Sequence, residues 1–280
     1  MNLLGIAWVL TWLVAIPTVV QDVGTVTFLE GSLRIIRGTT ALQAAEGTHL
    51  RQGDIIESSD KGFAQMEFVG GAIVALGPLT RTYVLRYGRG GTPGSEGSGA
   101  ELILLSGWLK GQSDAHAGLY RYESPLLAAM TGNGTVVFHQ EGNECDVFIE
   151  SGSAAISEVS PGGNAGKPAA GTAGQYFSCR QGKSLITSSH PSTAFVGAMP
   201  RSFRDALPSR LAHFAGKPVE PKVLHQVSYA EIQPWLTMPT AWRRSFVDRF
   251  KPRLKDPEFR KQIEIHVAEY PEWGPILHPE

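Results

Sequence analysis

The chain has 280 residues, which exceeds the usual size of one domain and predicts two modules plus a targeting segment. Its 25 Lys and Arg residues nearly balance its 26 Asp and Glu residues, so there is no strong field to attract nucleic acid, and we expect no nucleic-acid partner. Glycine (32 residues) and proline (18 residues) are abundant, which favours many short strands over a long helical bundle.

An almost wholly apolar run extends from Leu3 to Val20, before the first charged residue, Asp22. It predicts a signal peptide or an N-terminal membrane anchor in residues 1–21. No Lys or Arg precedes the run and no small-residue cleavage pattern precedes Asp22, so cleavage and retention both stay open. We expect a periplasmic or otherwise exported protein that contacts a membrane only through this segment, if it is uncleaved.

Residues 22–189 carry the alternating pattern of half-buried strands. In Phe63–Phe68, for example, Ala64, Met66 and Phe68 share one face. The other predicted strands are 25–29, 32–37, 72–76, 80–87, 101–105, 135–139, 146–150, 154–159 and 175–179. Asn133-Gly134 is predicted to form a type I′ turn between two of them. The pattern predicts a mainly β fold of stacked hairpins, as a sandwich or a short solenoid.

A short sequence recurs within this β region. VTFLEGS, at 26–32, is echoed by VFIESGS at 147–153 and more weakly by LLSGW at 104–108. Each segment is predicted to be a strand–turn–strand unit in which the glycine turns the chain. Chance similarity between amphipathic hairpins is the alternative.

The two cysteines, Cys145 and Cys179, both lie in the β region. An exported protein folds in an oxidising compartment, so we expect one disulfide between them. The alternative is two buried free thiols on neighbouring strands, because the sequence does not give the Cα separation that a disulfide requires.

Residues 199–280 change to a helical pattern and predict a small α-helical C-terminal module. A capping box begins at Ser228, and Trp242, Phe246 and Phe250 recur at helical spacing. Tryptophan and arginine are typical interface anchors, which makes the following set a candidate interaction surface: Trp108, Trp242, Arg243, Arg244 and Arg249. Alternatively, the tryptophans hold the tail to the β core.

One stretch of the β region resembles a known family. Leu50 is followed by Gly53-Asp54, then by Ser58-Ser59, the alternating strand Phe63–Phe68 and a glycine turn before a second strand. This order resembles the FecR-like family, with Gly53-Asp54 as its most specific pair, and the likeness covers roughly residues 22–182. The resemblance implies a β module of the cell envelope that binds a partner, known best in sensors that signal to a sigma factor. Only Met1 and Asn2 precede the apolar run, so we expect a stand-alone module here.

Known catalytic and metal-binding motifs are missing from the sequence, including HExxH, CxxC and GxSxG. We therefore expect no enzyme, no metal and no cofactor. An acidic cluster, Glu141, Glu144, Asp146 and Glu150, surrounds Cys145, and a hydrolase using these carboxylates is one alternative. A solvated strand edge is the simpler interpretation.

The leading hypothesis is a non-enzymatic exported binding or scaffolding module of the cell envelope. Its partner would be an envelope protein or a cell-wall polysaccharide. The second hypothesis is a sensory or regulatory subunit of an envelope signalling system that acts through a separate membrane partner. The domains would be 1–21, the signal peptide or anchor, 22–189, the FecR-like β domain, and 199–280, the helical module.

Overall fold

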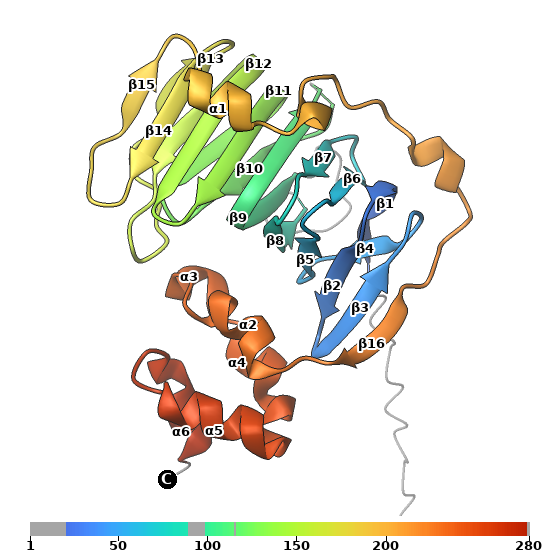
Figure 1. Cartoon of the computed structure of the whole chain (residues 1–280), viewed down its shortest axis with the longest axis vertical. Helices are drawn as coiled ribbons and strands as arrows, with labels where there is room; N and C mark the ends of the chain where they lie inside the picture. Colours follow the sequence, from blue (N-terminus) through green and yellow to red (C-terminus); the bar gives the residue numbers. More distant parts are fainter. Residues whose placement is uncertain (1–20, 89–98, 115, 279–280) are drawn as a thin grey trace, which may run out of the picture.

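The computed structural model describes residues 21–88, 99–114 and 116–278, so the predicted signal peptide or anchor lies almost wholly outside it. β-strands are the main secondary structure of the described chain, and short helices follow near the C-terminus (Figure 1). This confirms the predicted fold class. Within the described residues, no helix has both the length and the apolar character needed to cross a membrane.

The strands belong to one continuous hydrogen-bonded sheet. Their bounds are β1 Asp22–Glu30, β2 Leu33–Arg37, β3 Thr40–Ala44, β4 His49–Arg51, β5 Ile55–Ser58, β6 Phe63–Phe68, β7 Ile73–Leu76, β8 Arg81–Tyr87, β9 Ala100–Ser113, β10 Tyr120–Glu123, β11 Leu127–Glu141, β12 Glu144–Glu158, β13 Ala169–Thr172, β14 Tyr176–Arg180, β15 Ile186–Ser188 and β16 Lys222–Gln226. The helices are α1 Thr193–Ala198, α2 Tyr229–Leu236, α3 Thr240–Arg243, α4 Phe246–Phe250, α5 Pro257–Ile265 and α6 Gly274–Leu277, with four short 3-10 helices between them.

The sheet folds into two layers around a shared interior core. Along each strand the side chains alternate between this core and an outer face: Val74 of β7 points inward, for instance, while Ile73 and Ala75 point outward. Both outer faces are also covered, which is why strands such as β5 and β7 are buried at every position. The layer under the C-terminal helices is called the helix-side layer, and the opposite one the strap-side layer.

Three long strands, β9, β11 and β12, run through both layers. The first half of β9 pairs with β8 and β10, whereas its second half pairs with β7 and β11. Likewise, the first half of β12 pairs with β14 and its second half with β13. These strands bend at the point where they leave one layer and enter the other.

The recurring glycine sequences mark these bends. Gly107 and Gly152 lie inside β9 and β12 with φ of 91° and 70°, and Gly31 has φ of 74° where the chain passes from β1 to β2. A Cβ at Gly107 or Gly152 would meet a facing backbone atom at 2.5 Å or less, so only glycine fits. The predicted strand–turn–strand unit is present at Gly31, although β1 and β2 do not pair with each other, and it is wrong for the other two segments, whose glycines lie inside a strand. All three are corners where the chain changes layer.

The predicted turn at Asn133-Gly134 is also a corner. Both residues lie inside β11, between two register shifts in its pairing with β12. Gly134 has φ of 143°, and a Cβ there would lie 2.3 Å from the Ser151 carbonyl oxygen on the neighbouring strand. The prediction of unusual backbone geometry at Gly134 is correct. The glycine, however, bends a single strand and does not connect two strands.

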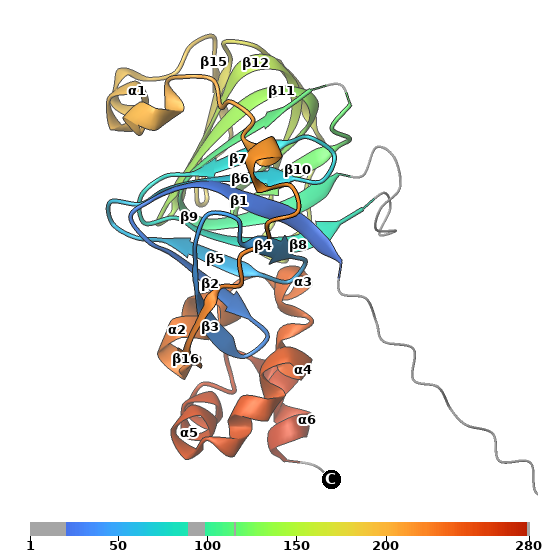
Figure 2. The same ribbon diagram turned by 90° about the vertical axis from the view of Figure 1, so that its right-hand side faces the viewer.

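The C-terminal helices, α2 to α6, are called the tail and cover the helix-side layer (Figure 2). Ile36, Tyr83 and Ile103 of the strands form one apolar cluster with side chains of the helices, among them Trp235 and Phe246. Tyr83 contacts both aromatic rings edge-on, at centroid distances of 6.3 and 5.4 Å. The tail therefore closes a second core against the sheet.

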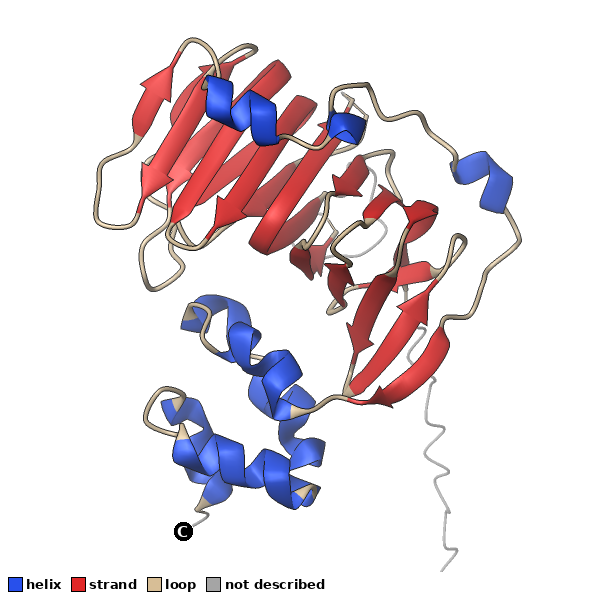
Figure 3. Ribbon diagram, in the orientation of Figure 1, coloured by secondary structure: helices blue, strands red, loops and turns tan. Residues whose placement is uncertain are grey.

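Strands β1 to β15 are called the β unit. Residues 189–221, called the strap, connect β15 to β16 around the outside of this unit (Figures 1 and 3). The strap begins over the strap-side layer, where Phe195 and Phe203 pack against Trp108 and Val137. It then leads to β16, which pairs with β3 at the edge of the helix-side layer. The strap thus carries the chain from one outer face of the β unit to the other.

The predicted disulfide is not formed. Cys145 and Cys179 are directly opposed on β12 and β14, but both are buried free thiols. The Ser124 hydroxyl donates to Cys145 Sγ at 3.1 Å, while Cys179 Sγ points to the Arg180 and Lys183 carbonyls. Directly opposed residues usually have Cβ atoms about 4.5–5.5 Å apart, wider than the ~3.8 Å of a disulfide. Burial raises the pKa of both thiols.

Candidate functional site

A cleft of about 950 Å³ opens along the edge where the two layers meet. Its walls come from the β1–β2 corner, the ends of β5 and β7, the Gly107 corner, the β11–β12 hairpin and the strap. The lining combines serine and glutamine side chains with four charged residues, Arg34, Glu57, Arg81 and Glu141. The corners that join the layers therefore also shape a wide depression on the surface.

Leu79 stands at this cleft in an unusual backbone conformation. Its φ is 51°, and no other non-glycine residue in the described part of the chain has a positive φ. An L-residue in the left-handed region costs about 1–2 kcal/mol. The Leu79 side chain gains little burial in return, because the residue is 65% exposed. Strain combined with an exposed apolar side chain indicates a functional position.

A dense set of hydrogen bonds holds the Leu79 turn in place. Its amide donates to the Ser59 carbonyl at 3.0 Å, and the next amide, of Thr80, donates to Ser58 Oγ at 2.9 Å. The hydroxyls of Ser58 and Thr80 both donate to the Gly77 carbonyl, at 2.6 and 2.9 Å. These buried contacts fix the turn, so Leu79 is presented on a rigid support.

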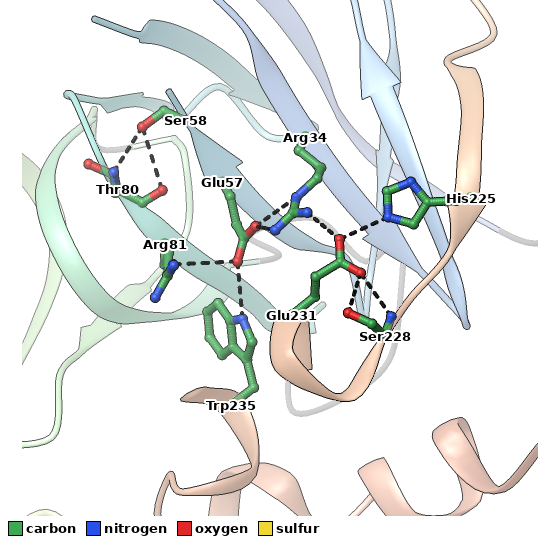
Figure 4. Close-up of polar contacts among 9 residues, drawn as sticks. All are labelled: Arg34, Glu57, Ser58, Thr80, Arg81, His225, Ser228, Glu231 and Trp235. Atoms are coloured by element: carbon green, nitrogen blue, oxygen red, sulfur yellow. Dashed lines mark hydrogen bonds and ion pairs between the residues drawn. The ribbon is translucent and has the colours of Figure 1, made fainter. Parts of the chain in front are cut away.

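Glu57 organises the charged floor of the cleft (Figure 4). Its Oε2 accepts hydrogen bonds from Arg34 Nε, at 2.9 Å, and from Arg34 Nη2. Its Oε1 accepts from Trp235 Nε1 at 3.4 Å and lies 3.6 Å from Arg81 Nε. The carboxylate is only 9% exposed and both of its oxygens are engaged. Glu57 therefore orients the two arginines.

The tail reaches the same cluster through Glu231. Its Oε1 contacts Arg34 Nη1 and lies 2.9 Å from His225 Nε2, while its Oε2 accepts from the Ser228 amide at 2.8 Å as part of the predicted capping box. Burial raises the pKa of Glu231, but hydrogen bonds from Ser228 and His225 outweigh it, so the pKa lies below its ordinary value. Arg34 thus bridges a carboxylate of the sheet and one of the tail.

The far wall of the cleft is built from Trp108 and His139. Their rings stack at a centroid distance of 4.0 Å, and Phe195 of the strap covers Trp108 at 5.1 Å. Burial lowers the pKa of His139, an effect larger than the opposing one of the nearby carboxylates. Trp108 itself is only 7% exposed, so it supports the wall and does not offer a free ring face.

The predicted motif turn, Gly53-Asp54, lies elsewhere and has a structural environment. Gly53 has φ of 89°, and buried Asp54 forms a two-point ion pair with Arg37, at 2.9 and 2.7 Å. The Gly53 carbonyl accepts from Arg249 Nη1 at 2.7 Å, and the same guanidinium donates to the carbonyls of Gly38 and Ile36. Burial lowers the pKa of Arg249. This turn is a docking point for the tail.

The residues of the predicted interaction surface do not form one surface. Trp108 belongs to the strap-side cluster, and Trp242 to the helix-side cluster. Arg243 is buried and pairs with Glu272 at 2.9 Å, whereas Arg244 is exposed. The burial of Trp242 in the cluster shared by strands and helices is that expected of a side chain that holds the tail to the β unit.

The acidic cluster is spread along two strands, and most of its members have separate partners. Glu144 pairs with Arg180 at 2.9 Å, and Glu150 pairs with Lys110 at 2.7 Å. Asp146 accepts a hydrogen bond from the Tyr176 hydroxyl at 2.6 Å. Only Glu141 is freely exposed, at 84%, and it lines the cleft. Within the described residues, no group of three or more His, Cys, Asp and Glu side chains is placed to hold a metal ion.

Sequence reasoning missed Leu79, Arg81, Arg34 and Glu57. Leu79 carried no signal, because nothing in the sequence around it requires a leucine in the left-handed region. The charged residues were detectable only as outward positions on alternating strands. Their meeting depends on the corners that bring β2, β5 and β8 beside the tail, which no local pattern encodes.

No protein-family model matches the chain, and no curated protein matches it. Among solved structures, two crystal structures of a protein described as "a putative anti-sigma factor from Parabacteroides distasonis ATCC 8503" are similar. The first matches with a TM-score of 0.39 and 8% identity, over 49% of this chain and 59% of that one. The second matches with a TM-score of 0.40 and 10% identity, over 51% and 64%. This chain thus spans less than two thirds of the length of these neighbours.

Proposed function

We propose that the protein is a non-enzymatic binding module of the cell envelope, of FecR-like type, and that the cleft at Leu79 recognises a protein partner. The observation that carries the proposal is Leu79 itself, an exposed leucine held in a strained conformation on a rigid turn. Strain of this kind persists where the surroundings over-determine it, as at ligand-binding positions. The partially exposed Arg81, two residues further on, adds the residue type most common at interface hot spots.

A protein partner is favoured over a wall polysaccharide because of the aromatic residue in the cleft. Sugar-binding clefts commonly offer an open aromatic face, whereas the Trp108 ring is only 7% exposed, stacked on His139 and packed against Phe195. Leu79 is the large exposed apolar side chain of the lining, and burying such a side chain against a partner is favourable by about 1.5–3 kcal/mol. Export and envelope localisation rest on the apolar run that precedes Asp22.

The test is site-specific photo-crosslinking in intact cells that produce the full chain. A photoreactive amino acid at position 79 should give one discrete crosslinked species. The same amino acid at position 265, a similarly exposed isoleucine on α5, should not give that species. Equal crosslinking at both positions, or none at position 79, would refute the protein-binding role of the cleft.

Sedimentation of the full chain with purified cell-wall sacculi measures the other ligand class. Saturable sedimentation that is lost in Leu79→Asp would assign the cleft to wall polysaccharide instead. If the crosslinked partner is an integral membrane protein, the regulatory-subunit hypothesis gains support over a scaffolding role.

A further inference from the structure

We propose that the partner enters the cleft as an extended segment that places a single carboxylate on Arg81 and an apolar side chain against Leu79. This inference rests on the proposed function, because it names the chemistry recognised at the same cleft. It follows from three features: the free face of the Arg81 guanidinium, the fixed position of Leu79 and the charge balance of the lining.

Arg81 is oriented but not satisfied. Its Nε lies 3.6 Å from Glu57 Oε1, a distance that allows an ion pair but exceeds that of a hydrogen bond. Its two Nη groups form no hydrogen bond with any described residue, and the side chain is 45% exposed. A guanidinium presents its donors as a planar fork that fits a carboxylate at two points. Arg81 therefore offers an unoccupied fork to the cleft.

Glu57 cannot fill this fork. Arg34 occupies its Oε2 through two nitrogens, and Trp235 donates to its Oε1. Moving Glu57 toward Arg81 would break contacts with both the sheet and the tail. A carboxylate supplied from outside meets no such competition, because Arg34 is held in turn between Glu57 and Glu231.

The position of Leu79 sets what accompanies the carboxylate. Leu79 precedes β8 and Arg81 begins it, so the two positions are two residues apart, or roughly 7 Å along an extended chain. In a partner segment of extended conformation, side chains two residues apart lie on the same face at comparable spacing. An acidic residue next-but-one to a large apolar residue can thus reach both positions at once.

The opposite wall argues against a polyanion. Glu141 lines the cleft and is 84% exposed, and within the described residues its ion-pair contact is with His139 Nε2, at 3.9 Å. Because burial lowers the pKa of His139, that ring offers Glu141 little positive charge near neutral pH. The lining therefore carries two arginines against two glutamates. A second carboxylate of the ligand near Glu141 would be repelled, so the cleft selects one acidic group.

Two matched probes test the inference on the full chain by NMR. N-acetyl-leucyl-alanyl-glutamate amide carries the proposed pair two residues apart, and N-acetyl-leucyl-alanyl-glutamine amide lacks only its charge. The Arg81 Nε–H and Leu79 methyl signals should shift saturably with the acidic probe. The neutral probe should bind about tenfold more weakly, since hydrogen bonds to charged groups are roughly twice as strong as neutral ones.

Arg81→Gln should abolish the preference for the acidic probe, whereas Arg244→Gln, which removes an exposed arginine in the tail, should preserve it. Equal binding of both probes, no binding of either, or a preference that survives Arg81→Gln overturns the inference. These outcomes are distinguishable from failure of the proposed function. If crosslinking at position 79 persists in Arg81→Gln, a protein still binds the cleft, and only the carboxylate recognition is wrong.

Discussion

The two outer faces of the β unit are covered by different chemistry. On the helix-side layer, apolar side chains of the sheet and the tail merge into one cluster around Trp235. On the strap-side layer, polar side chains of β6 and β9 hold the backbone of the strap. Buried Lys110 donates to the carbonyls of Phe203 and Asp205, at 2.7 and 2.9 Å.

Three more side chains form hydrogen bonds with the backbone further along the strap. Gln112 exchanges two hydrogen bonds with the backbone of Leu207, and Gln65 donates to the Pro208 carbonyl. Glu67 accepts from the Arg210 amide at 2.6 Å. An extended segment has unpaired backbone groups that burial would penalise, whereas a helix satisfies its own. The comparison shows that the conformation of the covering segment decides which side chains of the sheet hold it: polar ones for the extended strap and apolar ones for the helices.

The largest expected effect is on the helix side. Trp235→Ala removes a fully buried ring from the apolar cluster together with the hydrogen bond to Glu57. The free energy of unfolding, measured by urea denaturation, should fall by about 3–5 kcal/mol. Ile265→Ala, at a residue 60% exposed on α5, is the control and should change it by less than about 0.5 kcal/mol. Similar losses in the two variants would show that the tail is not docked through this cluster.

A smaller and more local effect is expected on the strap side. Lys110→Met keeps the apolar stem but leaves the two strap carbonyls without their donor and Glu150 without its ion-pair partner. The cost should be about 1–3 kcal/mol for the unsatisfied groups. Hydrogen exchange should accelerate at the Leu207 and Arg210 amides, while the amides of α2 stay protected.

Lys183→Met is the matched control for this prediction, because Lys183 is exposed and forms no ion pair with any described residue. Unchanged exchange in the strap of Lys110→Met would mean that apolar packing of Phe195 and Phe203 alone holds the strap. In that case the two faces would not differ as the contacts indicate.

The smallest effect concerns pH. Burial holds the pKa of His139 below its ordinary value of 6.5, so the unfolded chain binds a proton more readily than the folded one. The neutral His139 ring therefore makes its full contribution to the free energy of unfolding above about pH 6.5, and this contribution is lost as the pH falls below that value. In His139→Gln, the decrease in unfolding free energy between pH 7 and pH 5 should be shallower than in the unchanged protein. A slope identical in both would show that the His139 ring titrates normally.

The sequence was informative wherever a local rule decides the structure. Alternation in Phe63–Phe68 predicted that strand to the residue, and the capping box at Ser228 marked the start of α2. The change to a helical pattern correctly placed helices near the C-terminus. These signals need only neighbouring residues, because strand and helix periods are properties of a few turns or pleats.

The layer crossings could not be predicted in the same way. A glycine at position 107, 134 or 152 signals unusual backbone geometry, but a hairpin turn and a bend inside a strand both use it. The choice depends on which strands lie alongside, as with β7 and β11 beside the second half of β9. Buried Lys110 was missed for a related reason: its partners are backbone carbonyls nearly a hundred residues away.

The corner in β11 has a consequence for how the chain tolerates changes in length. An added or deleted residue inside a regular strand reverses the facing of every side chain beyond it, exchanging core for exterior. The pairing of β11 with β12 already shifts register between Met130 and Asn133 and again between Thr135 and Val136. An insertion there could be absorbed by the existing irregularity, which leaves the alternation on either side intact. The chain can thus gain or lose a residue at such a bend, whereas the regular parts of the same strands do not tolerate this change.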